Sequence, residues 1–310
     1  NLPPIKNKEM DVLIQIMIYV VSNTYRMNPN LTGMLFLRVF RLQLKYGATT
    51  ESAMVYINYA LILISGFNDI KQAMRFGKLA MTLADNQNSI VIKARIYFTY
   101  GIFLNHWEED YRTSIQYMRV MQQYGEQVGL NYQVTATSCF LCATQLANGT
   151  LLKELDEELQ YQQSNYADTP HVLSSDYLAE FQSWVSALRN KEIIPNWDSM
   201  ITLKDEEMVV VMHSILRLQM SYLFQNEQQA FHILETISES INAMSSLPTA
   251  PTYYFYRALW QFDFLKRHKK HRENRRQYLV EIKESVRKFK KWAKEAPHIY
   301  EHLYILLNFC

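Results

Sequence analysis

The chain has 310 residues and a net charge of +2; 48% of its residues are hydrophobic and 20% are charged. This composition is ordinary for a globular protein with a sizeable buried core. Eight glycines and eight prolines are too few for the many tight turns of a sheet protein, and three cysteines are too few for a disulfide framework.

The longest apolar run, residues 53–64, contains Asn58 and two tyrosines and is too short to cross a bilayer. Cys139, Cys142 and Cys310 are the only cysteines, which indicates a reducing compartment. We therefore expect a soluble, cytoplasmic fragment without a transmembrane segment.

Helical periodicity dominates the chain, and no convincing run with the period of a strand is present. In chain order, the predicted helices cover residues 6–22, 29–46, 51–65, 69–87, 89–104, 110–128, 131–146, 151–166, 174–190, 206–224, 228–244, 252–266, 272–295 and 299–308. The sequence therefore predicts an all-α fold.

The clearest of these helices covers residues 69–84. Ala73, Gly77 and Ala80 lie at positions i, i+4 and i+7 of one face, with larger apolar residues such as Met74 beside them. Small side chains on one face allow a second helix to approach closely. This pattern predicts a tight interhelical seam.

Predicted hairpins begin near residues 51, 89 and 131, about forty residues apart, and those near 206 and 250 repeat the interval. A standard tetratricopeptide unit has about 34 residues. We therefore expect an α-solenoid of degenerate tetratricopeptide-like hairpins, with an irregular all-α domain as the alternative. Residues 191–205 contain Pro195 and break the pattern, which predicts an irregular joint between repeat blocks at residues 1–190 and 206–310. The two blocks also fit one continuous superhelix.

No phosphate-binding glycine loop, GxSxG elbow or HExxH motif occurs in the sequence. The pair Cys139-x-x-Cys142 has zinc-like spacing, but no second pair accompanies it, and its helical context favours core packing. His213 and His232 lie within helical patterns without ligand partners. We expect a non-enzymatic chain that holds neither a cofactor nor a metal.

Residues 266–294 have the strongest local charge, with thirteen Lys or Arg against three Glu, a net +10 that leaves about −8 for the rest. The candidate basic patch consists of Lys266, Arg267, Lys269, Lys270, Arg272, Arg275, Arg276, Arg287, Lys288, Lys290 and Lys291. Such a patch steers acidic proteins, nucleic acids or anionic membranes. The last two are less favoured partners, because no nucleic-acid recognition module is present. The alternative is a solvated loop and outer helix face.

Tyrosines and one arginine on the first helices of the predicted hairpins are candidate contacts for a protein or peptide partner, since both residue types are frequent in binding hot spots. These candidates are Tyr56, Tyr59, Tyr97, Tyr100, Tyr132, Tyr253, Tyr254 and Arg257. The alternative interpretation is that the same side chains fill seams between helices.

Five stretches, taken together, resemble one family. They are LPPIKNKEMDVLIQIM, YRMNPNLTGMLFLRVFRLQLKYGATTESAMVYINYALIL, FNDIKQAMRFGKLAMTLAD, IYFTYGIFLNHWEEDYRTSIQYM and FKKWAKEAPHIYEHLYILL. They resemble the tetratricopeptide-like helical region that follows the signal-transduction ATPase module in large bacterial multi-sensor proteins. In that family a Ser/Thr-kinase-like domain often precedes the ATPase, and sensor, histidine-kinase or nucleotide-cyclase domains often follow the helical region.

The resemblance implies a regulatory segment between an ATPase switch and an output domain. The Walker motifs and the phosphoacceptor histidine of the family match nothing here, so no catalytic residue is carried over. His106-Trp107 corresponds to the family's recurring His-Trp pair, which we interpret as a packing and capping feature.

Three functions follow as hypotheses. The leading one is a signal-transduction scaffold that binds a protein or peptide and relays its occupancy to attached ATPase, kinase or cyclase domains. The second is a sensor with a small molecule buried between repeats, in a cavity lined by Met and aromatic side chains with a few polar groups. A stand-alone helical adaptor or effector is the third.

Overall fold

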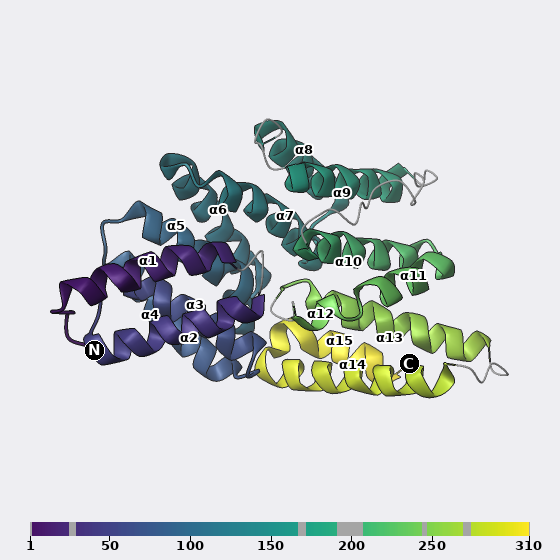
Figure 1. Ribbon diagram of the computed structural model, residues 1–310. Coiled ribbons are helices and arrows are strands. Elements are labelled where there is room, and N and C mark those ends of the chain that lie inside the picture. The colour runs from purple at the N-terminus through teal and green to yellow at the C-terminus, as the bar shows by residue number, and fades with distance from the viewer. Residues whose placement is uncertain are drawn as a thin grey trace. The chain divides into compact units, whose positions relative to one another are not determined.

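The computed structural model describes residues 2–24, 29–166, 172–190, 207–243, 247–268 and 274–309. Throughout this part the regular elements are helices (Figure 1), apart from an isolated bridge between Pro4 and Ala48. The α-helices are α1 (Lys8–Thr24), α2 (Pro29–Tyr46), α3 (Ser52–Ser65), α4 (Ile70–Asp85), α5 (Ile90–Thr99), α6 (Tyr111–Val128), α7 (Asn131–Ala147), α8 (Leu152–Tyr166), α9 (Val172–Asn190), α10 (Glu207–Leu223), α11 (Glu227–Ile237), α12 (Ser240–Ala243), α13 (Ala250–Arg267), α14 (Arg275–Glu295) and α15 (Pro297–Phe309).

The predicted all-α class is confirmed, and two of the predicted helices differ in detail. The helix expected over residues 89–104 changes after α5 to a π-helical turn, Tyr100–Leu104, followed by a 3₁₀ turn, Asn105–Trp107. The helix expected over residues 228–244 is divided into α11 and α12. The Ser238 hydroxyl bonds to the carbonyl of Glu235 where α11 ends, and local bonds of this kind compete with the helical ladder.

The chain forms two compact units, each described here by itself. Unit 1 contains residues 1–106 and 112–141, and unit 2 contains residues 107–111 and 142–310. The predicted joint at residues 191–205 lies outside the described residues, and the helices on either side of it, α9 and α10, pack together within unit 2. The compact units separate within α7, and the division expected at residues 191–205 stays a prediction.

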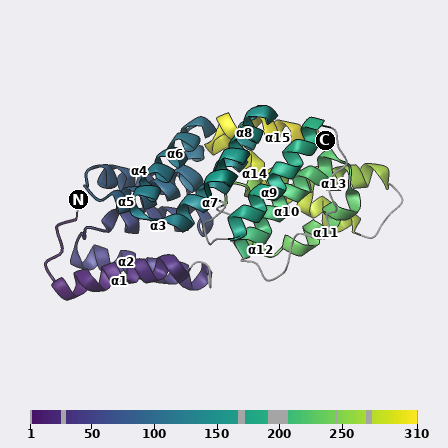
Figure 2. The same cartoon turned by 90° about the horizontal axis from the view of Figure 1, so that it is seen from above.

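In unit 1, helices that are close in sequence are also packed together. α1 packs on α2, α2 on α3, and α3 on α4, while α5 contacts both α3 and α4. Figure 2 shows α1 and α2 lying alongside one another from a second direction. Unit 1 is therefore assembled largely from contacts between successive helices.

The seam predicted on α4 is present within unit 1. Ala73 and Ala80 have no exposed surface, and Gly77 is buried. A Cβ atom at Gly77 would lie 3.0 Å from Leu104 Cδ1 and 3.2 Å from the Tyr100 ring, so the absence of a side chain permits this close approach. The helix begins at Asp69, whose carboxylate accepts a hydrogen bond from the Gln72 amide at 3.1 Å.

In unit 2 the successive packing continues. α8 packs on α9 and α9 on α10, while α10 contacts both α11 and α13; α14 then packs between α13 and α15. The largest fully buried side chains of this unit include Tyr253, Trp260, Phe289 and Tyr300. This aromatic core fixes the positions of α13, α14 and α15, which carry most of the candidate residues.

Among the described residues, the structure contains no helix that is both long enough and apolar enough to span a membrane.

The α4 seam predicts a large effect for a larger side chain. Ala80→Leu places an isobutyl group in a fully buried position and is expected to destabilise the protein by about 1–3 kcal/mol. Lys71→Leu, on the exposed side of the same helix, is the matched control and should have little effect. Urea denaturation followed by circular dichroism measures both, and equal stabilities would contradict the seam.

Candidate functional site

The predicted partner-contact residues lie mainly inside the molecule. Tyr56, Tyr100, Tyr253, Tyr254 and Arg257 are buried, with at most 8% of each exposed, whereas Tyr59, Tyr97 and Tyr132 are partly exposed. The Tyr59 ring stacks on Phe40 with ring centroids 4.0 Å apart. The seam interpretation therefore fits the buried five, and we no longer assign them to a partner surface.

Tyr97 is also engaged within its own unit. Its hydroxyl donates to the carboxylate of Asp85 at 3.0 Å. Burial and this carboxylate together raise the pKa of Tyr97 to about 12. The phenol is therefore protonated at neutral pH and links α5 to the end of α4.

The cluster around Arg257 shows why these residues are internal. Its guanidinium Nη2 donates to Glu284 Oε2 at 2.8 Å and to Ser285 Oγ at 3.0 Å, and its Cζ lies 5.0 Å from the Tyr254 ring centroid. Lys288 Nζ lies 4.6 Å from the same ring. These cation–π contacts and hydrogen bonds join α13 to α14. Burial raises the pKa of Tyr254 to about 12, so it remains a neutral phenol in this seam.

The members of the candidate basic patch fall into three groups: residues outside the described part of the chain, residues in ion pairs, and exposed residues. Lys269, Lys270 and Arg272 lie outside the described residues. Lys288 pairs with Glu284 in the α13–α14 seam, and Arg267 pairs with Glu227. The remaining members of the patch are exposed: Lys266, Arg275, Arg276, Arg287, Lys290 and Lys291.

Three of these exposed cations, Arg276, Arg287 and Lys290, lie on one side of α14, which we call the α14 outer face. It consists of Arg276, Leu279, Val280, Lys283, Arg287, Lys290 and Lys294. Arg276, Val280, Lys283, Arg287, Lys290 and Lys294 follow one another at alternating intervals of four and three residues, which places them in a single stripe. The opposite side, with Ile282, Phe289 and Trp292, is buried.

The acidic residues near the middle of α14 do not neutralise this stripe. The Glu281 carboxylate accepts hydrogen bonds from Gln261 and Gln277, and Glu284 pairs with Arg257 and Lys288. Within the described part of the chain, the five cations of the stripe form no ion pair. Their charge is therefore presented to solvent.

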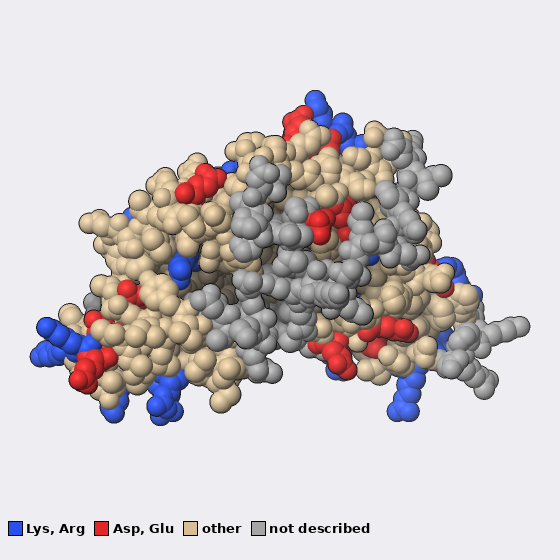
Figure 3. All heavy atoms as spheres, turned by 45° about the horizontal axis from the view of Figure 1, so that its top comes forward, with Lys and Arg blue, Asp and Glu red and all other residues tan. Residues whose placement is uncertain are grey.

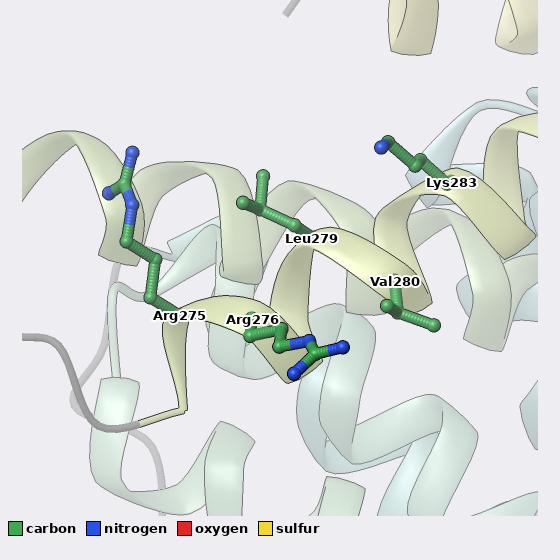
Figure 4. Close-up of a pocket in the computed structure, with 5 residues that line it drawn as sticks. All are labelled: Arg275, Arg276, Leu279, Val280 and Lys283. Atoms are coloured by element: carbon green, nitrogen blue, oxygen red, sulfur yellow. The ribbon is translucent and has the colours of Figure 1, made fainter.

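Two apolar side chains accompany the cations at the start of α14. Leu279 is 39% exposed and Val280 is 62% exposed, and together with Arg275, Arg276 and Lys283 they line a shallow hollow (Figure 4). On the face shown in Figure 3, the described cationic and anionic side chains lie in small separate groups.

Unit 2 also contains a cavity of about 210 Å³, which we call the unit 2 cavity. Its lining comes from α6, α7, α9, α10, α13 and α15 and includes Tyr177, Phe181, Leu216, Phe255 and Tyr300. None of the described lining residues is Asp, Glu, Lys or Arg. The sequence gives no local signal for this cavity, because its walls come from segments more than a hundred residues apart.

Several polar side chains belong to the lining of the cavity, among them Gln219, His302 and Thr249. Tyr111 and Tyr300 both line the cavity, and burial raises the pKa of Tyr111 to about 12 and that of Tyr300 well above its usual value. Thr249 is the residue before α13, yet its hydroxyl forms no capping bond to the helix. Its Oγ1 is buried without a hydrogen-bond partner in the described part of the chain.

A buried ionic cluster adjoins one wall of the cavity and was not anticipated from the sequence. Glu180 of α9 accepts from His213 Nδ1, 2.6 Å from its Oε2, and from Arg217 through Nε and through Nη2 at 3.2 Å. All three side chains are at most 6% exposed. Burial alone would raise the pKa of Glu180, but hydrogen bonds from His213 and Arg217 outweigh burial and lower it below 4.5.

This cluster fixes α9 against α10. The Tyr177 ring, which lines the cavity, lies edge-on to His213 with centroids 5.2 Å apart. His213 and Arg217 are four residues apart on one face of α10, opposite Glu180 of α9. That spacing is the only signal in the sequence that could have indicated the pair.

The remaining sequence motifs, the Cys139-x-x-Cys142 pair and the His106-Trp107 pair, contribute buried side chains. Cys139 and Cys142 are buried and form no disulfide, and the described residues contain no group of three or more His, Cys, Asp or Glu arranged to hold a metal ion. Trp107 is buried against the rings of Trp292 and Tyr300, at centroid distances of 6.4 and 5.4 Å. Of the His-Trp pair, Trp107 therefore serves to pack the core of unit 2.

No family model matches this chain, and neither a curated protein nor a solved structure shows significant similarity to it.

The ionic cluster predicts a strong and pH-dependent effect. Glu180→Gln leaves Arg217 buried without its counter-charge and is expected to destabilise the protein by about 3–5 kcal/mol. Because the pKa of Glu180 is lowered by folding, its stabilising effect is present above pH 4.5 and is lost as the pH falls through the lower folded-state value.

Urea denaturation between pH 3 and pH 7 measures this effect. The difference between wild type and Glu180→Gln should be largest near neutrality and should shrink in acid. Glu157→Gln, which removes an exposed partner of Lys153, is the control and should change stability little at any pH. A Glu180→Gln effect as small as that of the control would show that the cluster does not hold α9 and α10 together.

Proposed function

We propose that this chain is a non-catalytic regulatory scaffold that binds a protein or peptide and relays its occupancy to attached ATPase, kinase or cyclase domains. We further propose that its helices form a degenerate solenoid of tetratricopeptide-like hairpins. Packing between successive helices supports this arrangement, since each repeat of a solenoid contacts mainly its neighbours. The resemblance of five stretches to the helical region of bacterial multi-sensor ATPases supports the regulatory role.

The observation that carries the proposal is the α14 outer face. Five cations at helical spacing face solvent without ion-pair partners in the described residues, and two exposed apolar side chains lie at one end. A helix of 21 residues is about 31 Å long, which is enough to contact an extended or helical segment of a partner. We propose that the partner presents an acidic surface with apolar residues that cover Leu279 and Val280.

Two features favour a protein over the other anionic partners. A helix that lies on a membrane needs a broad exposed apolar face, whereas Ile282, Phe289 and Trp292 of α14 are buried and the exposed large apolar residues of this helix are Leu279 and Val280. Single-stranded nucleic acids stack their bases on exposed aromatic rings, and the α14 outer face has none. Its cations and its two aliphatic side chains together suit an acidic, partly apolar protein segment.

Binding to a synthetic peptide of Glu-Glu-Leu repeats tests this proposal. Fluorescence anisotropy of the labelled peptide should show binding that weakens as salt rises from about 0.05 to 0.5 M, because exposed charges are screened over roughly 4–14 Å in this range. Combined reversal of Arg276, Lys283, Arg287 and Lys290 to Glu should abolish it. Val280→Ser should weaken it without changing its salt dependence.

A control variant separates a local stripe from the total charge. Reversal of Lys71, Arg75 and Lys78 to Glu changes three exposed cations of α4 and should leave peptide binding nearly unchanged. Equal losses in the α4 and α14 variants would contradict a specific surface. Preference for phosphatidylserine vesicles or a DNA duplex over the peptide would replace the protein partner by that class.

A further inference from the structure

The unit 2 cavity is a separate feature from the α14 outer face, and it has the size and chemistry of a ligand site. We propose that it binds an uncharged, largely aromatic small molecule of one or two fused rings, with one hydrogen-bonding group directed to Thr249. The proposal rests on the volume of the cavity, the chemistry of its lining and the buried hydroxyl, and it does not depend on the partner proposed for α14.

Volume sets the size of the ligand. The cavity measures about 210 Å³, and a cavity of roughly 150 Å³ in another protein is known to hold benzene. A fused pair of rings such as indole therefore fits, whereas the larger ligands that occupy cavities of roughly 300–1,000 Å³ do not.

The lining sets the charge of the ligand. Aromatic rings from Tyr177, Phe181, Phe255 and Tyr300 and aliphatic side chains from α10 form most of the wall. A permanently charged ligand would lose its hydration without gaining a permanent counter-charge, because the described lining residues include no Asp, Glu, Lys or Arg, and their one imidazole, that of His302, belongs to an exposed residue. The nearby Glu180 is already paired with His213 and Arg217. An aromatic ligand, in contrast, finds ring edges and faces with which it can pack.

Thr249 sets the polar group of the ligand. Its hydroxyl lies in the position where a helix cap normally bonds to the first turn, but it forms no such bond. The first turn of α13 is instead closed by the backbone, where the Thr252 amide donates to the Thr249 carbonyl at 3.0 Å. Buried hydroxyls in proteins are nearly always hydrogen-bonded, so a partner for Oγ1 is expected from a molecule within the cavity.

Two probes of equal size separate packing from hydrogen bonding. Indole carries an N–H donor, and indene replaces it by a CH₂ group. Isothermal titration calorimetry with the 310-residue chain should show one saturable site for each, with indole bound several-fold more tightly because one hydrogen bond is added. The anion benzoate should not bind.

Three variants test the site. Thr249→Val keeps the shape but removes the hydroxyl; it should leave the melting temperature of the free protein unchanged or higher and should make indole and indene bind equally. Ala143→Leu fills space at the wall formed by α7 and should abolish binding of both probes, with Ile215→Phe as a second filling variant if the first fails to fold. Thr236→Val, an exposed threonine of α11, should change nothing.

The proposal is overturned if neither probe binds, which would mean that the cavity holds only water. It is also overturned if both filling variants fold and still bind, since the site would then lie elsewhere. An unchanged preference for indole in Thr249→Val would remove the assigned role of the hydroxyl. The α14 charge-reversal variant should bind indole normally, so failure of either proposal can be told apart from failure of the other.

Discussion

Close approach between neighbouring helices is the constraint on which each unit depends. In unit 1 it is met by side-chain size: Gly77 leaves room for Leu104 and Tyr100, and the fully buried Ala73 and Ala80 continue the seam. In unit 2 a buried ion pair joins two neighbouring helices, because Glu180 of α9 pairs with Arg217 of α10 and both side chains are at most 5% exposed. Both contacts tolerate little change. A larger side chain forced into the α4 seam, or removal of one partner of the buried ion pair, would cost a substantial part of the small free energy of unfolding.

Packing also determines which residues remain for function. Tyrosines are frequent at binding surfaces, yet many tyrosines of this chain are buried between successive helices. Tyr253 and Tyr254 of α13 are examples, and Tyr254 contacts Lys288 of α14. Two features are left over once the seams are complete. One is the cationic outer face of α14, and the other is the unit 2 cavity with the unused hydroxyl of Thr249. The first suits recognition of a macromolecule, and the second suits recognition of a small molecule.

The two proposals are compatible with one regulatory protein. A ligand in the unit 2 cavity would contact α9, α10, α13 and α15, and α13 and α15 both pack against α14. A ligand in the cavity would thus contact the helices that pack against α14 and position the α14 outer face. Any coupling between the two sites would have to be reciprocal, so that each partner changes the affinity for the other by the same factor.

Local pattern was sufficient for the helices and for the α4 seam. Helix formation depends on neighbours three or four residues away, and Ala73, Gly77 and Ala80 all lie within one helix. The helices and the α4 seam could therefore both be predicted from the sequence. The alternation of buried Ile282, Phe289 and Trp292 with cations on α14 was predictable for the same reason. The break between α11 and α12 could not be predicted from the helical period alone.

The all-α class, the approximate helix bounds and the concentration of positive charge near α14 follow from the amino-acid order, because each of these depends on residues close together in the chain. The burial of particular tyrosines, the link between α9 and α10 through Glu180 and the cavity that six helices line beside Thr249 became apparent in the folded structure. These properties depend on pairs of residues far apart in the chain, such as Tyr111 and Tyr300, and no local pattern specifies which distant surfaces will meet.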